Sequence, residues 1–278
     1  MININPFAEL AAAIPPATMQ VYVVLMFLLV VGGTILDMMH KKSAKYFFEN
    51  TKKAEKNATR SVSSGEKGSL ALQTIAHEVL TSGEFANPQR RMSHLLTMYG
   101  FILFVVTTAI LIFAYPTSAE AGIVPLLWHL GALMLCVGGY WFWFVIRVDV
   151  SAEGHPWYRL VRADLFIVSL LATATFALLW SAMQGSPFGW LLFALFVISS
   201  TTLFGTVLWS KFAHMFFKPA AAFQKRVVKA DGSRENMPAI FDLNDPAVHA
   251  KFPDVPTYMG KNPPNMGLGI KREAPRHF

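Results

Sequence analysis

The sequence predicts an all-α integral membrane protein. We expect a bundle of five transmembrane helices, with the N-terminus outside, the C-terminus in the cytoplasm and an extended C-terminal tail. The 278 residues are 54% hydrophobic and only 15% charged, whereas a soluble domain carries about 25% charged residues. The apolar residues also gather in five runs, each near the roughly 20 residues that span a bilayer as a helix. These runs are 19–39, 94–114, 123–146, 164–183 and 188–211.

The first run has the features of a retained helix. Residues 1–20 contain no Lys or Arg, although a secretory signal peptide begins with a positively charged region. No small-residue cleavage site follows the run either. We therefore expect 19–39 to stay in the protein as its first span.

Positive charge marks one side of the predicted bundle. All 24 Lys and Arg residues lie in three segments: ten in 40–93, three in 147–163 and eleven from Lys211 onward. Basic segments remain on the cytoplasmic side of a membrane. We therefore expect a multi-pass protein of a bacterial inner (cytoplasmic) membrane. The net charge of +7 then reflects topology, and no nucleic-acid partner is expected.

A membrane domain is expected over 1–225, and it includes a cytoplasmic loop at 40–93. The loop begins with a lysine-rich stretch, 41–56, which we predict to continue the first helix. A Ser-rich and Gly-containing stretch at 61–65 is expected to be flexible, because such composition is typical of linkers. A short helix is predicted after it, at 69–81.

The second part of the chain, 226–278, is predicted to be an extended cytoplasmic tail. From Ala220 onward the sequence is rich in Pro, Gly and Asn and lacks helical or strand periodicity over most of its length. Such a segment does not bury a core of its own. Its scattered aromatic and apolar residues favour wrapping on a partner over a purely solvating tail. These anchors are Phe241, Phe252, Tyr258, Met259, Met266 and Phe278.

Cysteine chemistry is excluded by number. The chain has one cysteine, Cys136, so it forms no internal disulfide and lacks the roughly four thiolates of a Cys-ligated iron–sulfur cluster. No Gly-rich phosphate loop, nucleophile elbow or zinc spacing is present either. The candidates for chemistry are therefore the polar residues in and beside the spans.

Two histidines stand at matching ends of the second and fifth predicted spans. His94 opens 94–114 and His214 follows 188–211, so both lie at the cytoplasmic end if these spans run in opposite directions. Two neutral imidazoles from different helices are the axial ligands that a b-type haem takes. Histidines at a membrane edge also reach water without any ligand. The pair therefore predicts a haem-iron site, with ordinary interfacial histidines as the alternative.

Groups that would assist a haem lie close to both histidines. A carboxylate at the membrane edge pairs with a cation, so nearby basic residues suit the haem propionates. Each imidazole also needs a hydrogen-bond partner for its second ring nitrogen, and the hydroxyls of Ser93 and Ser210 are candidates. The propionate candidates are Arg90, Arg91, Lys211 and Lys218.

Three further polar residues are candidates for a quinone site. His129 lies about six residues into the third run, roughly 9 Å below the outer face, too far from the histidine pair to share its cofactor. The alternative for His129 is a satisfied polar contact between helices. Arg162 and Asp164 lie at the inner entry of the fourth run. Asp164 equally suits a helix start, where the helix dipole favours an acid.

Two segments resemble a known family of membrane subunits. Residues 90–101, RRMSHLLTMYGF, resemble the second helix of the nitrate reductase gamma-subunit family, which includes the membrane subunits of heterodisulfide reductases. Residues 211–219, KFAHMFFKP, are similar to the fifth helix of that family, with its terminal histidine and following proline. The resemblance covers roughly residues 20–225. It implies five helices and an outside N-terminus.

The resemblance also implies a cofactor. Family members of the nitrate reductase type hold two b haems with four histidines on helices two and five. His94 and His214 match the pair that binds the inner haem. The other two ligand positions hold Phe104 and Phe196 in this sequence. The resemblance therefore implies a single haem b near the cytoplasmic face and no outer haem.

The C-terminal sequence resembles a narrower group. Residues 266–278, MGLGIKREAPRHF, are similar to the ending of membrane anchors tied to adenylylsulfate reductase in sulfur-oxidising bacteria. This implies a cytoplasmic iron–sulfur flavoprotein that interconverts adenylylsulfate with sulfite and AMP, bound by loop 40–93 and tail 226–278. The chain is then expected to be a membrane anchor and electron-transfer subunit that links this partner to the quinone pool. It would be either non-catalytic or the quinone-reacting subunit.

Two other functions are also compatible with parts of the sequence. A haem-free structural anchor that recruits a soluble redox enzyme would need the tail but not the histidines. A small transporter is disfavoured, because paired inverted repeats and broken helices are missing and intramembrane charges are few.

Overall fold

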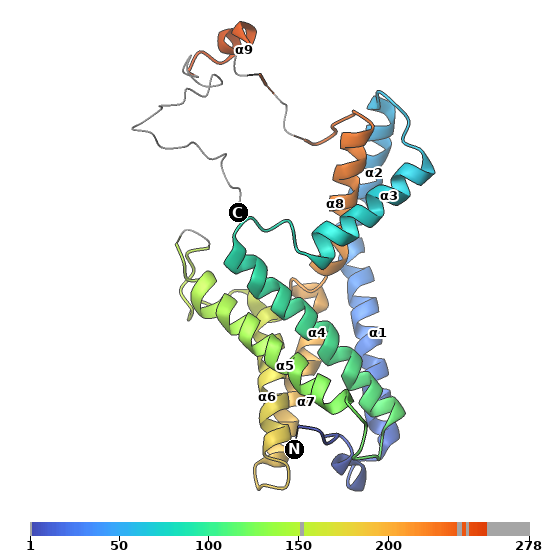
Figure 1. The fold of residues 1–278 in the computed structure, drawn as a ribbon, viewed down its shortest axis with the longest axis vertical. Helices are drawn as coiled ribbons and strands as arrows, with labels where there is room; N and C mark the ends of the chain where they lie inside the picture. The colour runs from blue at the N-terminus through green and yellow to red at the C-terminus, as the bar shows by residue number, and fades with distance from the viewer. Residues whose placement is uncertain (1, 151–152, 238–240, 243–244, 255–278) are drawn as a thin grey trace.

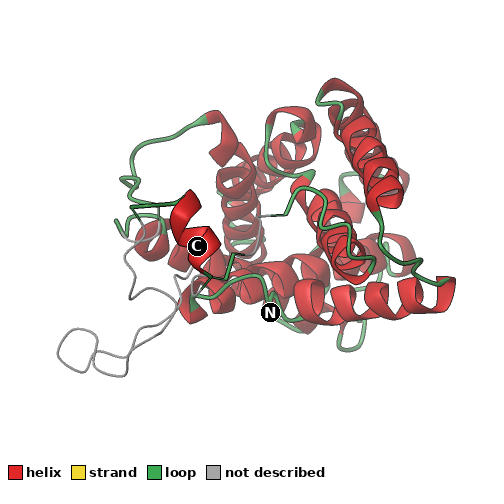
Figure 2. Ribbon diagram, turned by 90° about the horizontal axis from the view of Figure 1, so that it is seen from above, coloured by secondary structure: helices red, strands yellow, loops and turns green. Residues whose placement is uncertain are grey.

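Helices joined by turns make up the structure of this chain. The computed structural model describes residues 2–150, 153–237, 241–242 and 245–254, and this part contains no strand (Figure 2). Within it, four helices are long and apolar enough to cross a membrane, which makes the chain a multi-pass membrane protein. They are α1 (Pro16–His40), α4 (Pro88–Ala114), α5 (Val124–Trp141) with a π-helical extension (Phe142–Ile146), and α6 (Leu165–Ala182) preceded by the 3₁₀ turn Arg162–Asp164.

The membrane helices form a bundle with α1 along its flank (Figure 1). α4 packs against α5, α5 against α6, and α6 against α7 (Gly189–Gly205), in the order of the chain. α1 contacts α7 and α4 more sparsely. Most of α1 faces outward, with Phe27 and Leu28 more than half exposed. A helix that is apolar on all sides and poorly covered by protein is suited to contact with lipid.

Local capping signals decide where α4 begins. The side chain of Asn87 accepts hydrogen bonds from the backbone N–H groups of Gln89 and Arg90, and Pro88 occupies the first helical position. Asparagine as a cap and proline at the first position are both favoured there. The cap starts α4 before the apolar run, so His94 lies in the second turn of the helix and not at its first residue.

The fifth apolar run does not form one continuous helix. α7 ends at Gly205, and α8 (His214–Ala230) begins after a 3₁₀ turn. The prediction of one helix over 188–211 is therefore wrong. In the break, Ser210 Oγ accepts a hydrogen bond from the backbone N–H of Phe212. Hydroxyls that bond the local backbone compete with helix formation, and average hydropathy does not register this competition.

Two glycines allow α4 and α5 to approach each other closely. A Cβ atom added to Gly100 would lie 2.9 Å from the backbone O of Gly131 and the backbone N of Leu135. A Cβ atom added to Gly131 would lie 2.7 Å from the backbone N of Phe104. Both distances are shorter than real Cβ contacts, so a larger residue would push the helices apart. Small residues let membrane helices pack backbone to backbone in this way.

The variant Gly131→Ala is expected to destabilise the bundle by about 1–3 kcal/mol, the usual cost of overpacking. Gly32→Ala in α1 is the matched control, because a Cβ atom there meets nothing within 4 Å. Thermal unfolding in detergent, followed by circular dichroism, measures the difference. Equal stability of the two variants would contradict the close approach of α4 and α5.

One end of the bundle gathers the segments predicted to lie outside. Asn5 is fully buried, and its side-chain amide donates to the carbonyls of Tyr115 at 2.8 Å and Ser118 at 3.1 Å in the α4–α5 connection. The α6–α7 connection reaches the same N-terminal segment, because Gln184 Nε2 donates to Pro6 O at 2.5 Å. These three segments carry no Lys or Arg. Their position at one end is what the predicted topology requires.

The opposite end carries a group of helices beyond the bundle (Figure 1). α2 (Ser43–Asn57) and α3 (Ser64–Thr74) both pack against α8. The prediction that 41–56 continues the first helix is wrong. Lys42 adopts a left-handed backbone conformation with φ of 53° and separates α1 from α2.

The helix predicted at 69–81 begins earlier than expected. Ser63 Oγ accepts a hydrogen bond from the backbone N–H of Glu66, which makes Ser63 the cap of α3. The stretch 61–65, expected to be flexible, therefore contains the start of this helix. A π-helical turn, Ile75–Leu80, follows α3.

The beginning of the tail is helical, contrary to the sequence prediction. α8 is amphipathic and continues to Ala230, across the expected boundary at residue 225, with Val228 buried. Further on, a short helix α9 (Pro246–Lys251) forms, and the ring centroids of Phe241 and Phe252 lie 5.1 Å apart. The four anchors predicted beyond residue 254 lie outside the described residues.

Candidate functional site

The imidazole of His94 is held at its Nδ1 atom. Ser82 Oγ lies 2.9 Å from His94 Nδ1, and Ser82 is fully buried in the turn before α4. Ser82 has a left-handed backbone conformation with φ of 48°, which the surrounding fold must stabilise because this region disfavours residues other than glycine. In the described part of the chain, His94 Nε2 makes no hydrogen bond.

The imidazole of His214 is held in the same manner. Its Nδ1 atom lies within hydrogen-bonding distance of the backbone carbonyl of Lys211. A carbonyl only accepts, so Nδ1 carries the proton and the neutral ring presents an unprotonated Nε2. No partner for His214 Nε2 is found among the described residues. The edge of Phe166 packs on the ring, with 5.8 Å between ring centroids.

Glu84, Phe85 and Lys218 lie between and around the two imidazoles. Lys218 Nζ is 2.9 Å from Glu84 Oε1, and both charges act on His94 and on His214. The two histidines also interact electrostatically with each other. The centroid of the Phe85 ring lies 4.9 Å from that of His94 and 5.3 Å from Lys218 Nζ. The structure thus brings the two predicted ligand residues together at one end of the bundle.

Burial favours the neutral form of His214. Removal from water lowers the pKa of His214, since it disfavours the charged imidazolium. The carbonyl of Lys211 and the carboxylate of Glu84 act in the opposite direction, while the ammonium of Lys218 lowers the pKa further. The net lowering of the pKa favours the neutral ring. Neutral imidazole is the form that binds a metal.

Two of the predicted propionate partners are already in ion pairs. Arg90 Nη2 lies 2.6 Å from Glu153 Oε1, and Lys218 is paired with Glu84. A propionate would therefore compete with a protein carboxylate for either cation. Glu84 lies in the turn before α4, and Glu153 lies in the α5–α6 connection. No sequence pattern around either acid predicts an ion pair with these cations.

The other two predicted propionate partners are less committed. Arg91 Nε donates to the backbone carbonyl of Thr81 at 2.6 Å. Lys211 is exposed, and no acidic partner for it occurs in the described ranges. Arg91 and Lys211 are therefore freer than the other two to meet a negatively charged ligand.

The hydroxyl partners expected for the imidazoles are wrong. Ser93 Oγ donates to the carbonyl of Gly138 at 2.8 Å and ties α4 to α5, while Ser210 bonds the local backbone. The observed partners are Ser82 and the carbonyl of Lys211. Ser82 precedes His94 by 12 residues, and it reaches the ring because the intervening chain turns back. Sequence proximity favoured the adjacent serine, which the helix directs elsewhere.

The donor chemistry of the pair fits a b-type haem. A metal-bound imidazole usually fixes its other nitrogen by a hydrogen bond, which sets the tautomer and the ring orientation. Both His94 and His214 meet this requirement. No group of three or more His, Cys, Asp or Glu side chains that would hold a bare metal ion occurs within the described residues. A haem needs only two protein donors, because the porphyrin supplies the others.

The structure places His129 in a helix-to-helix contact. Its Nδ1 atom lies 2.7 Å from the carbonyl of Pro125, and its Nε2 atom lies 2.7 Å from Ser181 Oγ of α6. Both ring nitrogens are therefore engaged. This geometry matches the alternative of a satisfied polar contact, and a quinone would have to displace Ser181 to reach the ring.

Asp164 belongs to a buried ion pair at the start of α6. Arg147 is 1% exposed, and its Nη2 atom lies 2.6 Å from Asp164 Oδ2. The same guanidinium donates to the carbonyls of Pro156 and Arg159 and stands 4.1 Å from the ring centroid of Trp143. The group closes the α5–α6 connection onto the end of α5. In the sequence, Arg147 is one loop arginine among several, and no signal marks it as buried.

Arg162, the third quinone candidate, differs from His129 and Asp164 in its exposure. Arg162 is exposed at the start of the turn before α6, whereas His129 and Asp164 are already engaged by protein groups. Asp164 also accepts a hydrogen bond from the backbone N–H of Val161 at 3.0 Å, which agrees with its expected role at a helix start.

Phe104 and Phe196, the residues that the family resemblance aligns with the outer ligands, meet edge to face inside the bundle. The ring centroids of Phe104 and Phe196 lie 6.4 Å apart, and both rings are buried. Trp128 packs on Phe104 at 5.2 Å, and Trp180 stacks on Phe196 at 5.8 Å. Phe7 of the N-terminal segment contacts both tryptophans. Aromatic side chains therefore fill this region of the bundle.

Comparison of the chain with protein-family models, curated proteins and solved structures finds no match.

Proposed function

We propose that this chain is the membrane anchor and electron-transfer subunit of an oxidoreductase complex. In this proposal, one b-type haem on His94 and His214 links a cytoplasmic redox enzyme, similar to adenylylsulfate reductase, to the quinone pool. The complex would lie in a bacterial inner membrane. The chain itself would be either non-catalytic or the subunit that reacts with quinone.

One observation carries the proposal. Two half-buried imidazoles from α4 and α8 lie near each other, each bonded at Nδ1 and each without a partner at Nε2 among the described residues. An ordinary interfacial histidine would direct its polar atoms to water. A pair that fixes the same nitrogen and leaves the other free is suited to two axial bonds from opposite faces of a flat cofactor.

Each part of the site would have a distinct task. A bound haem would supply a one-electron carrier. The chain's residues would hold it: His94 and His214 at the iron, and Ser82 as the group that orients the first imidazole. Arg91 and Lys211 would face the propionates, because these cations have no acidic partner among the described residues.

A single haem is favoured by the packing of the outer half of the bundle. Phe104 and Phe196 hold the positions that the family resemblance assigns to the outer ligands, and Trp128 and Trp180 pack on them. Phenylalanine offers no donor to iron, and close-packed aromatic rings leave no room for a second macrocycle. Electrons would therefore pass between the partner and quinone in the inner half of the membrane.

The fifth crossing is part of the proposal. α7 has 17 residues and rises roughly 26 Å, somewhat less than the ~30 Å hydrocarbon core. The 3₁₀ turn Val207–Trp209 continues the apolar path towards His214. We therefore assign the fifth crossing to α7 together with this turn.

A haem-free structural anchor is the second candidate. Phe85 packs on His94, and the pair of Lys218 with Glu84 lies beside both imidazoles. A haem would need these side chains to move aside. If they stay, the histidines serve only to join the turn before α4 to α8.

The haem content of the purified chain separates the two candidates. A chain produced in a host with ample haem is expected to contain one b haem, measured by the pyridine haemochrome spectrum against protein concentration. A value near zero would support the structural anchor. A value near two would contradict the assignment of a filled outer region.

A second test concerns partner docking. Exposed Lys52, Lys53 and Lys56 on α2 form a basic surface, to which an acidic protein face is attracted.

Removing residues 238–278 leaves α8 and the turn after it intact. This truncation is expected to release the soluble partner during co-purification from native membranes while the haem content stays unchanged. Full retention of the partner would show that the tail is not its binding segment.

A further inference from the structure

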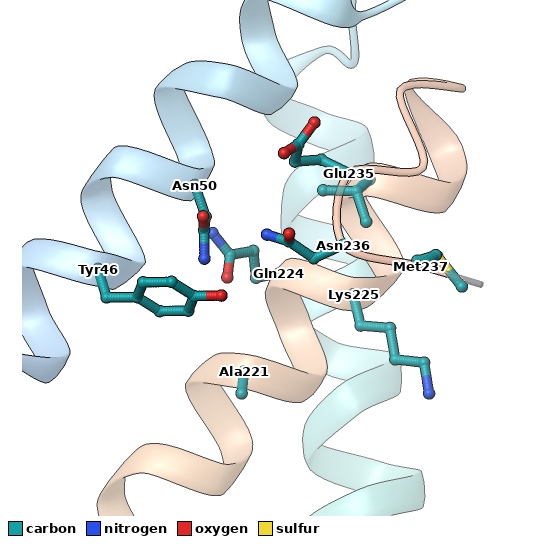
Figure 3. Close-up of a pocket in the computed structure, with 9 residues that line it drawn as sticks. Tyr46, Asn50, Ala221, Gln224, Lys225, Glu235, Asn236 and Met237 are labelled. Carbon is teal, nitrogen blue, oxygen red and sulfur yellow. The ribbon is translucent and has the colours of Figure 1, made fainter. Parts of the chain in front are cut away.

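A cavity lies between α2 and α8 at the cytoplasmic end of the protein (Figure 3). It has a volume of about 300 Å³, at the lower end of the range for small-molecule sites. The turn that follows α8 closes one side. Neither His94 nor His214 lines it, so the cavity is separate from the proposed haem site.

Asn50 provides the strongest sign of a ligand. Its side chain is 92% buried, since its exposed fraction is 8%, and it points into the cavity in Figure 3. No hydrogen bond to its side-chain amide is found within the described residues. The amide therefore keeps its donor and acceptor atoms available. Such a group at the wall of a cavity is suited to bind something inside it.

Gln224 and Asn236 face the same space. Gln224 Nε2 donates to the carbonyl of Phe47 at 3.0 Å and to Thr51 Oγ1 at 2.8 Å. These bonds fix the amide and leave Gln224 Oε1 as an acceptor. Asn236 reaches in from the turn after α8, where its backbone is left-handed with φ of 56°. Figure 3 shows these carboxamides converging with that of Asn50.

Aromatic and charged groups complete the lining. The hydroxyl of Tyr46 points into the cavity in Figure 3, and the tyrosine ring forms part of the rim. Val228 and Met237 supply apolar surface. Lys225 is exposed and has no acidic partner in the described part of the chain. Glu235, also in the lining, accepts a hydrogen bond from Asn57 Nδ2 at 3.2 Å.

The combination of side chains selects a class of ligand. A primary carboxamide presents a donor beside an acceptor, and it pairs with a planar ring edge that offers the complementary pair. Asparagine and glutamine recognise adenine in this way, through its exocyclic amine and the neighbouring ring nitrogen. Guanine is instead read by arginine or lysine, and cytosine by acidic side chains. In Figure 3 the Lys225 side chain extends away from the carboxamides, and Glu235 already accepts a hydrogen bond from Asn57. The unpaired carboxamide of Asn50, with the acceptor Oε1 of Gln224 beside it, therefore favours adenine.

We propose that this cavity binds the adenine base of a nucleoside or nucleotide. Asn50 pairs with the edge of the base through its donor and its acceptor, Gln224 Oε1 accepts a hydrogen bond from the exocyclic amine, and Lys225 receives a phosphate at the mouth. The site gives the chain a cytoplasmic ligand that is independent of the proposed haem. Its position between α2 and α8 means that the ligand contacts two of the helices that form the cytoplasmic group.

Calorimetric titration of the full chain in detergent tests the proposal. Adenosine is expected to bind, and inosine about tenfold or more weakly, because its carbonyl replaces the amine that the carboxamides bind. Asn50→Leu is expected to weaken adenosine binding by about tenfold or more through the loss of its hydrogen bonds. Gln73→Leu in α3 removes a carboxamide outside the cavity and is expected to change nothing.

A second variant keeps the test decisive if Asn50→Leu does not fold. Lys225→Ala is expected to weaken the binding of adenosine diphosphate several-fold and to leave the binding of adenosine unchanged. Equal binding of adenosine and inosine would overturn the proposal, as would the absence of adenosine binding to the unmodified chain at millimolar concentration. Binding of a blocked dipeptide amide in place of adenosine would also overturn it, because the carboxamides would then recognise a peptide group.

Discussion

Replacing His94 or His214 by alanine is expected to abolish the reduced absorption band of the b-type haem in the purified chain. In the proposed site each imidazole would supply one of the two protein donors to the iron, so the loss of either would leave the haem held by a single residue. The two rings come from different helices, α4 and α8. The effect is therefore expected to be all or none for each variant.

Optical spectra of dithionite-reduced protein measure this effect. His40→Ala is the control, because His40 is exposed at the C-terminal end of α1 and has no place at the proposed site. Circular dichroism must show that all three variants keep their helices. An unchanged band in both His94→Ala and His214→Ala would refute the ligand assignment, even if the protein contains haem.

The second large effect is expected at the buried ion pair of Arg147 with Asp164. Asp164→Ala leaves a fully buried guanidinium with the carbonyls of Pro156 and Arg159 as its remaining polar partners. Removing one member of a buried pair typically costs about 3–5 kcal/mol, because the other charge stays desolvated. We expect a loss of this size in the free energy of unfolding, accompanied by opening of the α5–α6 connection.

A double variant distinguishes charge burial from a simple loss of contact. Arg147→Met combined with Asp164→Ala removes both charges, and it is expected to be more stable than Asp164→Ala alone. Unfolding in mixed detergent and dodecyl sulfate, followed by tryptophan fluorescence, measures both free energies. Arg162→Met, at an exposed position nearby, is the control and is expected to lie within about 0.5 kcal/mol of the unmodified chain. A double variant that is less stable than Asp164→Ala would show that the guanidinium stabilises the loop without its acid.

Several features of the fold were predictable from single-sequence patterns. The apolar runs located α1, α4, α5 and α6 to within a few residues, because a bilayer requires apolar length of any helix that crosses it. The absence of Lys and Arg from three segments grouped the N-terminus with two loops, and Asn5 and Gln184 join those segments in the structure. His94 and His214 were assigned to one end by the same charge pattern, and the structure brings them together.

Other features depended on competition between local and tertiary interactions. Hydropathy predicted that the fifth span continues to residue 211, but α7 ends at Gly205. In the break that follows, the backbone N–H of Phe212 donates a hydrogen bond to Ser210 Oγ. Low periodicity indicated an irregular tail from Ala220, yet α8 continues to Ala230 because its apolar side packs on α2 and α3. Packing of this kind routinely overrides weak local preferences.

In the candidate site, too, some features were predictable from the sequence and others depended on tertiary contacts. Residue type and depth selected the histidines as candidate ligands. They did not reveal that Ser82 and Glu84 surround them, since both lie in a turn whose path the sequence does not specify. Arg147 was one basic loop residue among several until the structure placed it at 1% exposure against Trp143.

By itself, the sequence determined that this is a helical membrane protein and which of its segments share an end. Apolar length and the sign of charge are conditions that a bilayer imposes on every fold, and both can be counted along the chain. The tertiary structure alone decided which nitrogen of each histidine is free, which arginine is buried and that a cavity opens beside Asn50. Those outcomes depend on where helices break and on which turns fold back, and they arise from contacts between residues far apart in the sequence.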